Sequence, residues 1–305
     1  MSAIVKLQTE ILVIGGGAAG MAAAAGAAAR GATVLLVDER PYLGGILPQC
    51  IHKGFGHGFY GQDLTGPEYC EKEVRRFSAS GASYLSRAHV TKILPDRTAL
   101  IVSPDGLIQC SFNQCVLATG CREKTIYSLE VSGTRPNGIY TAGEAQEMLN
   151  LGHYDIGSRV VILGSGDIGQ IVARRLVIMG KTVAAMAEIN DHPGGMKRNH
   201  IECIERYHIP VILRSTVTRV HGYPNITAVT LRHLDTGVEE IISCDTLITA
   251  LGLVPELTAA ESLKTEEGFP DWLHLCGNAD YVHEIVDRVT TDGLELGSLL
   301  GRCNQ

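Results

Sequence analysis

The feature that most constrains the fold is a nucleotide-binding pattern near the start of the chain. In "EILVIGGGAAGMAAAAGAAARGATVLLVDE" the apolar strand "ILVI" runs into Gly15, Gly17 and Gly20, which are spaced G-x-G-x-x-G. A helix over 21–30 is predicted next, ended by Gly31, and "TVLLV" then reads as a second buried strand. Glycines at this spacing permit a tight turn, close approach of a pyrophosphate and close helix–strand packing. The unit therefore predicts dinucleotide binding.

Two further features of this unit suit a dinucleotide. The N-terminus of the helix offers unpaired N–H groups and a positive dipole end to the phosphates. Asp38 stands at the end of the second strand, where an acid binds a ribose hydroxyl.

The same design occurs a second time, in "SRVVILGSGDIGQIVARRLVIMGKTVAAMAEI". Gly164, Gly166 and Gly169 repeat the first motif at an offset of 164 − 15 = 149 residues. The second strand ends at Glu188 without a basic cluster, and its carboxylate would repel a 2′-phosphate, so NADH is favoured over NADPH. Lys197 and the arginine after it lie too far along to reverse this preference. The alternative is a second unit that folds but binds no nucleotide.

Composition excludes several other classes of function. The formal net charge is −7, with no basic run, which argues against nucleic acid or an anionic membrane as the main partner. No apolar run reaches the ~18 residues of a membrane span, and the start runs straight into a strand, so we expect a cytoplasmic protein. The nine Cys include no C-x-x-C and the His are scattered, so no metal site is predicted.

The two glycine units, "LATGCRE" between them and "LHLCGNADYVHEIVDRVTTDGLELG" near the end resemble the pyridine nucleotide–disulfide oxidoreductase superfamily of flavoproteins. The chain looks most similar to the small FAD subunits of opine and proline dehydrogenases and of hydrogen cyanide synthase. The resemblance implies an α/β fold of two Rossmann-like domains, of the three-layer ββα type. The FAD domain would comprise 1–123 and 270–305. The NAD(P) domain, 124–269, would be inserted into it, with linkers near "TRPNG" and "GFPDW".

The resemblance also assigns residues to each cofactor. FAD would contact the first glycine loop, the end of the second strand, a Gly-Gly turn, a crossover triplet and a C-terminal motif: Gly15, Gly17, Ala18, Ala19, Gly20, Asp38, Glu39, Arg40, Gly44, Gly45, Ile46, Val90, Ala118, Thr119, Gly120, Gly277, Asn278 and Val289. NAD(H) would contact the second loop and strand end: Gly164, Gly166, Asp167, Ile168, Gly169 and Glu188. Asn278 replaces the usual Asp and can still bind a ribityl hydroxyl. The helix around 288–293 would point its N-terminus at the flavin.

The stretch "YLGGILPQCIHKGFGHG" contains the catalytic candidates, Cys50 and His52. The redox Cys pair that follows such a turn in disulfide reductases is absent, and so is the C-x-x-C of thioredoxin reductases, so a dithiol disulfide reductase is not predicted. Cys50 could cycle through a sulfenic acid if its pKa were lowered, and His52 could protonate a reduced acceptor. Alternatively, both only line the flavin pocket. His57, Tyr60 and Tyr69 then lie in a segment that covers the flavin, meets a partner or is a plain surface loop.

Two functions remain open. The chain is either an FAD-dependent oxidoreductase that moves electrons between NAD(H) and a small-molecule or quinone acceptor, or an FAD electron-transfer subunit. In the second case a larger flavoprotein dehydrogenase subunit oxidises an amine, opine or hydroxy acid, and this chain alone has little NADH activity. Both predict a homo- or hetero-oligomer.

Overall fold

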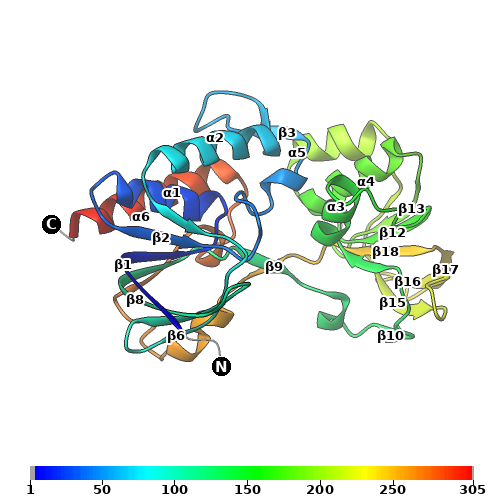
Figure 1. Ribbon diagram of the computed structural model, residues 1–305. Coiled ribbons are helices and arrows are strands. Elements are labelled where there is room, and N and C mark those ends of the chain that lie inside the picture. The colour runs from blue at the N-terminus through cyan, green and yellow to red at the C-terminus, as the bar shows by residue number, and fades with distance from the viewer. Residues whose placement is uncertain (1–3, 304–305) are drawn as a thin grey trace. The chain divides into compact units, whose positions relative to one another are not determined.

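The computed structural model describes residues 4–303, and the chain divides into two compact units (Figure 1). The first unit holds the residues up to 122 and those from 255 onward, and the second holds 123–254. At the two crossings, the strands β9 (Cys121–Glu123) and β19 (Leu253–Pro255) pair with each other.

The return crossing lies earlier than the predicted limit at 269/270. The short helix η4 (Thr258–Leu263) buries Ala260 and Leu263 in the core of the first unit, together with Trp272. "GFPDW" therefore belongs to the body of the first unit. "TRPNG" belongs to the second unit, where Thr134 donates its N–H to the carbonyl oxygen of Val220 at 3.1 Å. Neither segment is a linker.

The first unit is built on one mixed sheet in the order β5-β2-β1-β8-β7-β6, with β20 pairing β8. Strands β1, β2, β5, β8 and β20 are parallel, whereas β6, β7 and β8 form an antiparallel meander. The strands are β1 (Val5–Ile14), β2 (Val34–Val37), β5 (Ser83–Leu85), β6 (His89–Leu94), β7 (Thr98–Ser103), β8 (Gly106–Leu117) and β20 (Leu273–Leu275), with a small hairpin of β3 (Lys53–Phe55) and β4 (Leu64–Thr65).

Successive side chains of β1 point to opposite faces of the sheet, and a separate hydrophobic core lies on each face. Ile11 and Val13 pack with the helices, while Leu12 and Ile14 pack with the meander. The helices are α1 (Ala18–Ala28), α2 (Gly66–Ala79) and α6 (Val286–Cys303), with the short 3-10 helices η1 (Leu47–Gln49) and η5 (Gly277–Ala279). This is the predicted three-layer arrangement. Helix α1 begins three residues before the predicted start at 21, because it starts directly at the glycine loop.

Helices α1 and α6 lie side by side (Figure 1) and touch main chain to main chain. Glycines recur every fourth residue on α6 and face alanines that recur every fourth residue on α1: Gly293, Gly297 and Gly301 against Ala19, Ala23 and Ala27. A Cβ added at Gly297 would lie 2.0 Å from the carbonyl oxygen of Ala23, and one added at Gly293 would lie 2.4 Å from that of Ala19. The abundance of Ala in α1 therefore reflects a contact that admits almost no side-chain volume.

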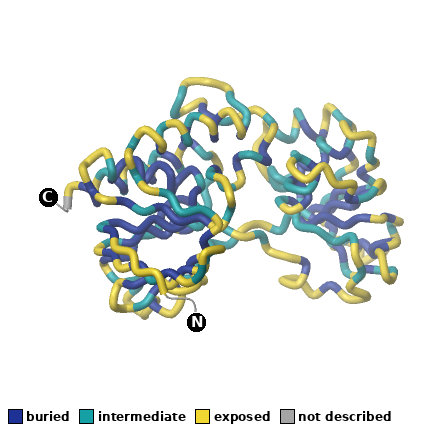
Figure 2. The backbone as a smooth tube through the Cα atoms, in the orientation of Figure 1, coloured by how far each residue is buried: buried dark blue, intermediate teal, exposed yellow. Residues whose placement is uncertain are grey.

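The second unit holds a parallel sheet, β11-β18-β12-β13-β14, and a second sheet, β10-β15-β16-β17. Its strands are β10 (Ser132–Gly133), β11 (Ile139–Thr141), β12 (Arg159–Leu163), β13 (Thr182–Ala187), β14 (Val211–Ile212), β15 (Ser215–His221), β16 (Ala228–His233), β17 (Glu239–Ser243) and β18 (Thr246–Thr249). Its helices are η2 (Ile126–Ser128), α3 (Ala142–Asn150), α4 (Asp167–Ile178), α5 (Lys197–Asn199) and the π-helical turn η3 (His200–Glu205). The parallel sheet has a helix core on one face and the other sheet on the opposite face, so its central strands β12 and β18 are almost entirely buried (Figure 2).

The α1–α6 contact predicts the effect of one added methyl group. Gly297→Ala gains about 1 kcal/mol of helix propensity, but the methyl group meets main-chain atoms that cannot rotate away. We expect the free energy of unfolding to fall by about 2 kcal/mol, as in other overpacked cores. Denaturant unfolding followed by circular dichroism measures this, with the exposed Glu295→Ala of the same helix as control. A Gly297→Ala variant as stable as the parent would contradict the contact.

Candidate dinucleotide-binding sites

The three glycines of the first loop have different roles. Gly15 has φ +103°, and a Cβ there would lie 2.3 Å from the carbonyl oxygen of Ala118. A Cβ at Gly20 would lie 1.8 Å from the carbonyl oxygen of Gly15. A Cβ at Gly17 would meet nothing within 4 Å. Gly15 and Gly20 are thus required by the turn and its packing, whereas Gly17 faces open space at the start of α1.

The way in which the helices begin separates two classes. Helices α2 and α3 each start with a complete capping box, formed by Thr65 with Glu68 and by Thr141 with Glu144. Helix α1 instead has Gly17 at its N-cap, no side-chain cap and no acid in its first turn. Its first N–H groups are therefore left to solvent or to an anion, as at phosphate-binding helix ends.

Asp38 is buried beside the first glycine loop. Its Oδ2 accepts the N–H of Gly16 at 2.5 Å, and its Oδ1 accepts the N–H of Arg40 at 2.7 Å. Burial raises the pKa of Asp38, although these two hydrogen bonds oppose the rise. A carboxylate has about four acceptor positions, so about half remain open to ribose hydroxyls.

Other predicted residues near Asp38 point elsewhere. Glu39 is exposed, with Oε2 at 3.0 Å from Nδ1 of His89. Arg40 donates from Nη1 to the Tyr42 hydroxyl at 3.2 Å, also at the surface. The side chain of Val90 is buried in the core on the meander face. The side chain of Asp38, in contrast, is hydrogen-bonded to the loop.

Three other predicted segments meet the first loop. Gly44 donates its N–H to the carbonyl oxygen of Gly16 at 2.8 Å, and a Cβ at Gly45 would lie 3.2 Å from Cα of Gly17, while Ile46 is exposed. Ala118 of the crossover triplet lies against Gly15, and Thr119 and Gly120 bond to the main chain of Glu256. A Cβ at Gly277 would lie 2.7 Å from Cβ of Ala19 and 3.1 Å from Cγ1 of Val289. The Gly-Gly turn, the triplet and the C-terminal motif therefore gather at the start of α1.

Asn278 is held on both sides of its amide. Its Oδ1 accepts the N–H of His283 at 3.0 Å, and its Nδ2 lies 3.7 Å from Sγ of Cys121. The side chain joins the Gly277 turn to the loop before α6.

Cys50 and His52 directly follow η1. Cys50 is buried, its Sγ donates to the carbonyl oxygen of Ile46 at 3.4 Å, and burial raises the pKa of its thiol to about 12. A protonated, buried thiol favours the interpretation of Cys50 as a small pocket wall over that of a sulfenic-acid centre. His52 places Nδ1 at 3.0 Å from the carbonyl oxygen of Lys53, and its ring lies 5.1 Å from that of Phe55.

The loop after His52 is anchored by a carboxylate that the sequence analysis did not single out. Asp287, in the first turn of α6, accepts the N–H groups of Gly56 at 3.0 Å and Gly58 at 2.6 Å. Tyr60 donates to the buried Glu73 at 2.5 Å. A glycine-rich loop needs acceptors for its N–H groups. The acceptor for Gly56, Asp287, lies 231 residues further along the chain, so the local spacing of residues could not identify it.

The other two aromatic or His candidates lie in different settings. Tyr69, in α2, is fully buried and donates to Oγ1 of Thr290 at 2.7 Å. His57, in the loop, is exposed and pairs with Asp63 at 3.0 Å. The start of α6 therefore carries a carboxylate that is already bound to this loop.

The second glycine loop repeats the backbone of the first. Gly164 has φ +100°, and a Cβ there would lie 2.3 Å from the carbonyl oxygen of Ala250, which takes the place of Ala118. A Cβ at Gly169 would lie 2.8 Å from the carbonyl oxygen of Gly164, and one at Gly166 would meet nothing within 4 Å. The sequence analysis missed the second triplet, Ala250 to Gly252, although "TALG" resembles "LATG".

The side chains of the second loop are more heavily engaged. Glu188 is buried, and it accepts four hydrogen bonds, from the N–H and hydroxyl of Ser165 at 3.0 and 2.5 Å and from the N–H and side-chain amide of Asn190 at 3.0 and 2.7 Å. Burial would raise the pKa of Glu188, but these hydrogen bonds outweigh it and lower the pKa. Oδ1 of Asp167 accepts from the N–H of Met196, and Ile168 packs partly on the helix core.

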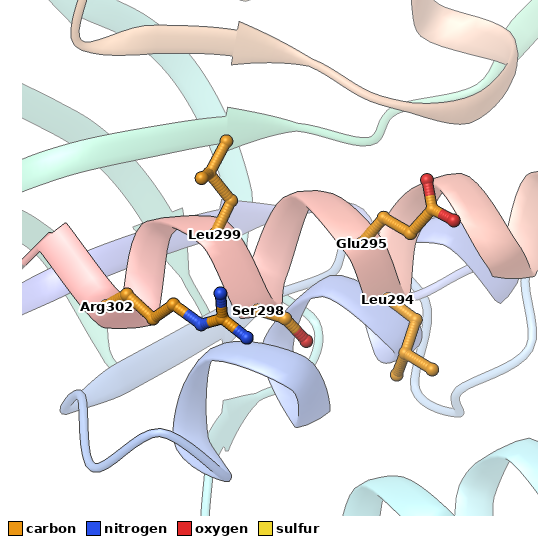
Figure 3. Close-up of a pocket in the computed structure, with 5 residues that line it drawn as sticks. All are labelled: Leu294, Glu295, Ser298, Leu299 and Arg302. Carbon is orange, nitrogen blue, oxygen red and sulfur yellow. The ribbon is translucent and has the colours of Figure 1, made fainter.

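Other surface features lie apart from these loops. Figure 3 shows five side chains of α6 that line a pocket of about 350 Å³: Leu294, Glu295, Ser298, Leu299 and Arg302. None of them is a predicted cofactor residue. Within residues 4–303, no helix combines the length and apolar character needed to cross a bilayer. The same residues contain no group of three His, Cys, Asp or Glu suited to a metal ion.

Comparison with known proteins identifies the family. The model of the pyridine nucleotide-disulphide oxidoreductases matches residues 9–269, and the chain belongs to this family of flavin-dependent oxidoreductases. Its members typically bind FAD and a pyridine nucleotide.

Two curated relatives and one solved structure illustrate the similarity. The hydrogen cyanide synthase subunit HcnB of Pseudomonas protegens is 27% identical over 58% of this chain and 38% of its own length. An opine oxidase subunit of Agrobacterium tumefaciens is 32% identical over 56% of this chain and 35% of its own length. The matches thus span little more than a third of each relative. The thioredoxin reductase of T. acidophilum superposes with a TM-score of 0.79 at 20% identity, covering 98% of this chain and 99% of that one, which establishes the predicted fold.

The environment of Cys50 predicts an unreactive thiol. Because its pKa is raised to about 12, the thiol stays protonated at pH 8, and iodoacetamide should leave Cys50 unlabelled in the native protein but label it in urea. Mass-spectrometric mapping measures this, with the half-buried Cys121 as a reference within the same chain. Rapid labelling of Cys50 in the native protein would contradict this prediction. So would a dimedone adduct of Cys50 after treatment with mild peroxide, because dimedone reacts with sulfenic acids, and either result would favour the redox role of Cys50.

Proposed function

We propose that this member of the family binds FAD on its first glycine loop and moves electrons between NAD(H), bound on the second loop, and an acceptor or a partner protein. The observation that carries the FAD assignment is the open start of α1. Gly17 faces open space, α1 has no side-chain cap, and Asp38 keeps about two acceptor positions unused. The protein caps α2 and α3 fully, whereas α1 and α4 both begin at a glycine without a side-chain cap. Of these two, α1 also lacks an acid in its first turn, and an anionic ligand would satisfy its exposed N–H groups.

The residues around this loop would each hold one part of FAD. The N–H groups at the start of α1 and the turn at Gly44 and Gly45 would bind the pyrophosphate, and Asp38 would bind the adenosine ribose. Ala118 and Gly120 would let the main chain come close to the isoalloxazine. When bound, FAD supplies the two-electron chemistry between a hydride donor and an acceptor. The protein's own part is to position the nucleotides and to exclude water.

Glu188 supports NAD(H) over NADP(H). Its lowered pKa keeps the carboxylate ionised at neutral pH, and a negative charge at the end of β13 would repel a 2′-phosphate. The absent Cys pair supports an oxidoreductase that does not work by dithiol exchange.

A second candidate is a relay subunit with little NADH activity of its own. Its support is that two curated relatives, HcnB and the opine oxidase protein, are named as subunits. In this role a partner would oxidise an amine, an opine or a hydroxy acid and pass the electrons to FAD. Co-purification distinguishes the candidates, because a stoichiometric partner favours the relay and a homo-oligomer that turns over NADH favours the enzyme.

The ribose assignment predicts the effect of Asp38→Asn. The amide removes the charge and places a donor where an acceptor is needed, so we expect the dissociation constant of FAD to rise at least about tenfold. Titration of apoprotein with FAD, followed by flavin fluorescence, measures this. Glu39→Gln is the matched control, because Glu39 points to His89. If Asp38→Asn bound FAD as tightly as the control, the assignment would be wrong.

Electron transfer from NADH is tested by anaerobic titration of the flavin absorbance with NADH and then with NADPH. For the enzyme we expect NADH to bleach the flavin at near-stoichiometric amounts and NADPH to act far more weakly. Bleaching by dithionite alone would favour the relay. A chain that takes up no FAD would exclude both candidates.

A further inference from the structure

The two glycine loops share a backbone, but the second has three polar side chains that the first lacks. The first loop and helix carry Gly16, Ala18 and Met21, whereas the second carries Ser165, Asp167 and Gln170 at the same places in the repeat. The repeat also extends to the turn after the second strand, because "PGGM", which contains Gly194 and Gly195, matches "LGGI". Both turns pack against the start of the helix, α1 in the first unit and α4 in the second.

All three polar side chains of the second loop bind this turn. Oγ of Ser165 accepts the N–H of Gly194 at 2.8 Å, and Nε2 of Gln170 donates to the carbonyl oxygen of Gly194 at 2.6 Å. Oδ1 of Asp167 accepts the N–H of Met196 at 2.8 Å and the side-chain amide of Asn199 at 2.6 Å. The turn is therefore fastened to the loop by side chains that the first unit does not possess.

The carboxylate of Asp167 occupies two N–H donors beside the start of α4, those of the Met196 main chain and the Asn199 side chain. The residue equivalent to Met196 in the first unit is Ile46, and the residue equivalent to Asp167 is Ala18, whose methyl group accepts no hydrogen bond. The N–H of Ile46 thus has no carboxylate to bind. In the second unit, a negative charge stands at the first position of α4, where the helix dipole favours an anion.

Two further observations agree with a loop whose polar groups are hydrogen-bonded within the protein. A Cβ at Gly195 would lie 2.6 Å from Oδ1 and 2.9 Å from the main-chain nitrogen of Asp167, so the turn is pressed onto the helix start. Glu188 has used its four acceptor positions within the loop, whereas Asp38 has used two. Lys197 and Arg198 follow the turn, and both are exposed, whereas Asp167 is half-buried. Solvent therefore screens the two positive charges more strongly than it screens the negative charge of Asp167.

We propose that Asp167 competes with the pyrophosphate of NAD(H) from within the protein. Its carboxylate holds the turn at 193–196, and Asn199 after it, on the second loop and keeps the affinity for NAD(H) low. The inference rests on the proposed function, because it takes the second unit to be the NAD(H) site. NAD(H) binds when the carboxylate releases the N–H of Met196 to a phosphate oxygen. Asp167 therefore sets how much NAD(H) the protein holds at a given concentration.

The test compares NAD⁺ binding to the FAD-loaded full chain by calorimetry, so that no electron transfer is needed. Asp167→Ala installs the residue of the first loop, and Asp167→Asn removes the charge while keeping an acceptor for Met196. We expect both variants to bind NAD⁺ about tenfold more tightly or better. Asp191→Asn, in the same segment and with the same change in net charge, is exposed and should leave the affinity unchanged.

Unaltered FAD content and thermal midpoint show that the variants are folded. If Asp167→Ala fails to fold, the isosteric Asp167→Asn decides. Unchanged or weaker binding in folded variants overturns the inference. If the parent already binds NAD⁺ tightly and the variants do not improve on it, only this inference falls. If neither the parent nor any variant binds NAD⁺, the NAD(H) site of the proposed function falls with it.

Discussion

The first unit depends on the direct main-chain contact between α1 and α6. This contact fixes the start of α1, which belongs to the N-terminal part of the chain, against the segment at 277–289, which comes from the C-terminal part. Because glycine and alanine leave no layer of side chains between the helices, their separation cannot adjust to fill gaps. The same contact holds Gly277 against Ala19, so the geometry of the candidate FAD loop follows from it.

The two units show how one backbone design serves two different chemical settings. In each unit a strand ends in a buried acid that binds the second residue of its glycine loop and the residue two places further on. The first loop is otherwise lined by Gly, Ala and Met, which leave its polar groups available. The second loop adds Ser, Asp and Gln, whose side chains hydrogen-bond to the main chain of the turn. The repeat therefore preserves the fold while the capacity to bind an anion differs between its copies.

Much of this architecture could be predicted from the sequence, because its determinants are local. The strand–loop–helix units and the position of Asp38 follow from short patterns with a fixed geometry. The resemblance to the family, not a local pattern, implied that the Gly-Gly turn and the triplet gather at the first loop. The return crossing could not be located, because the burial of Ala260 and Leu263 against Trp272 is a tertiary contact without a local pattern. Asp287 and Asp167 were missed as anchors for the same reason. An acid in the first turn of a helix reads as a favourable dipole partner, and only its contacts show which main chain it binds.

The pairing of β8 has a consequence for the order in which the protein can fold. Strand β8 bonds β1 along one edge, and along the other it bonds β7 near its beginning and β20 near its end. Strand β20 and helix α6 follow the whole second unit in the chain, so a growing chain completes the continuous unit first. Until residues 273–303 emerge from the ribosome, the end of β8 that pairs β20 and the glycine-facing side of α1 lack their partners. The nascent protein must therefore protect an unfinished sheet and an apolar helix throughout the synthesis of its middle part.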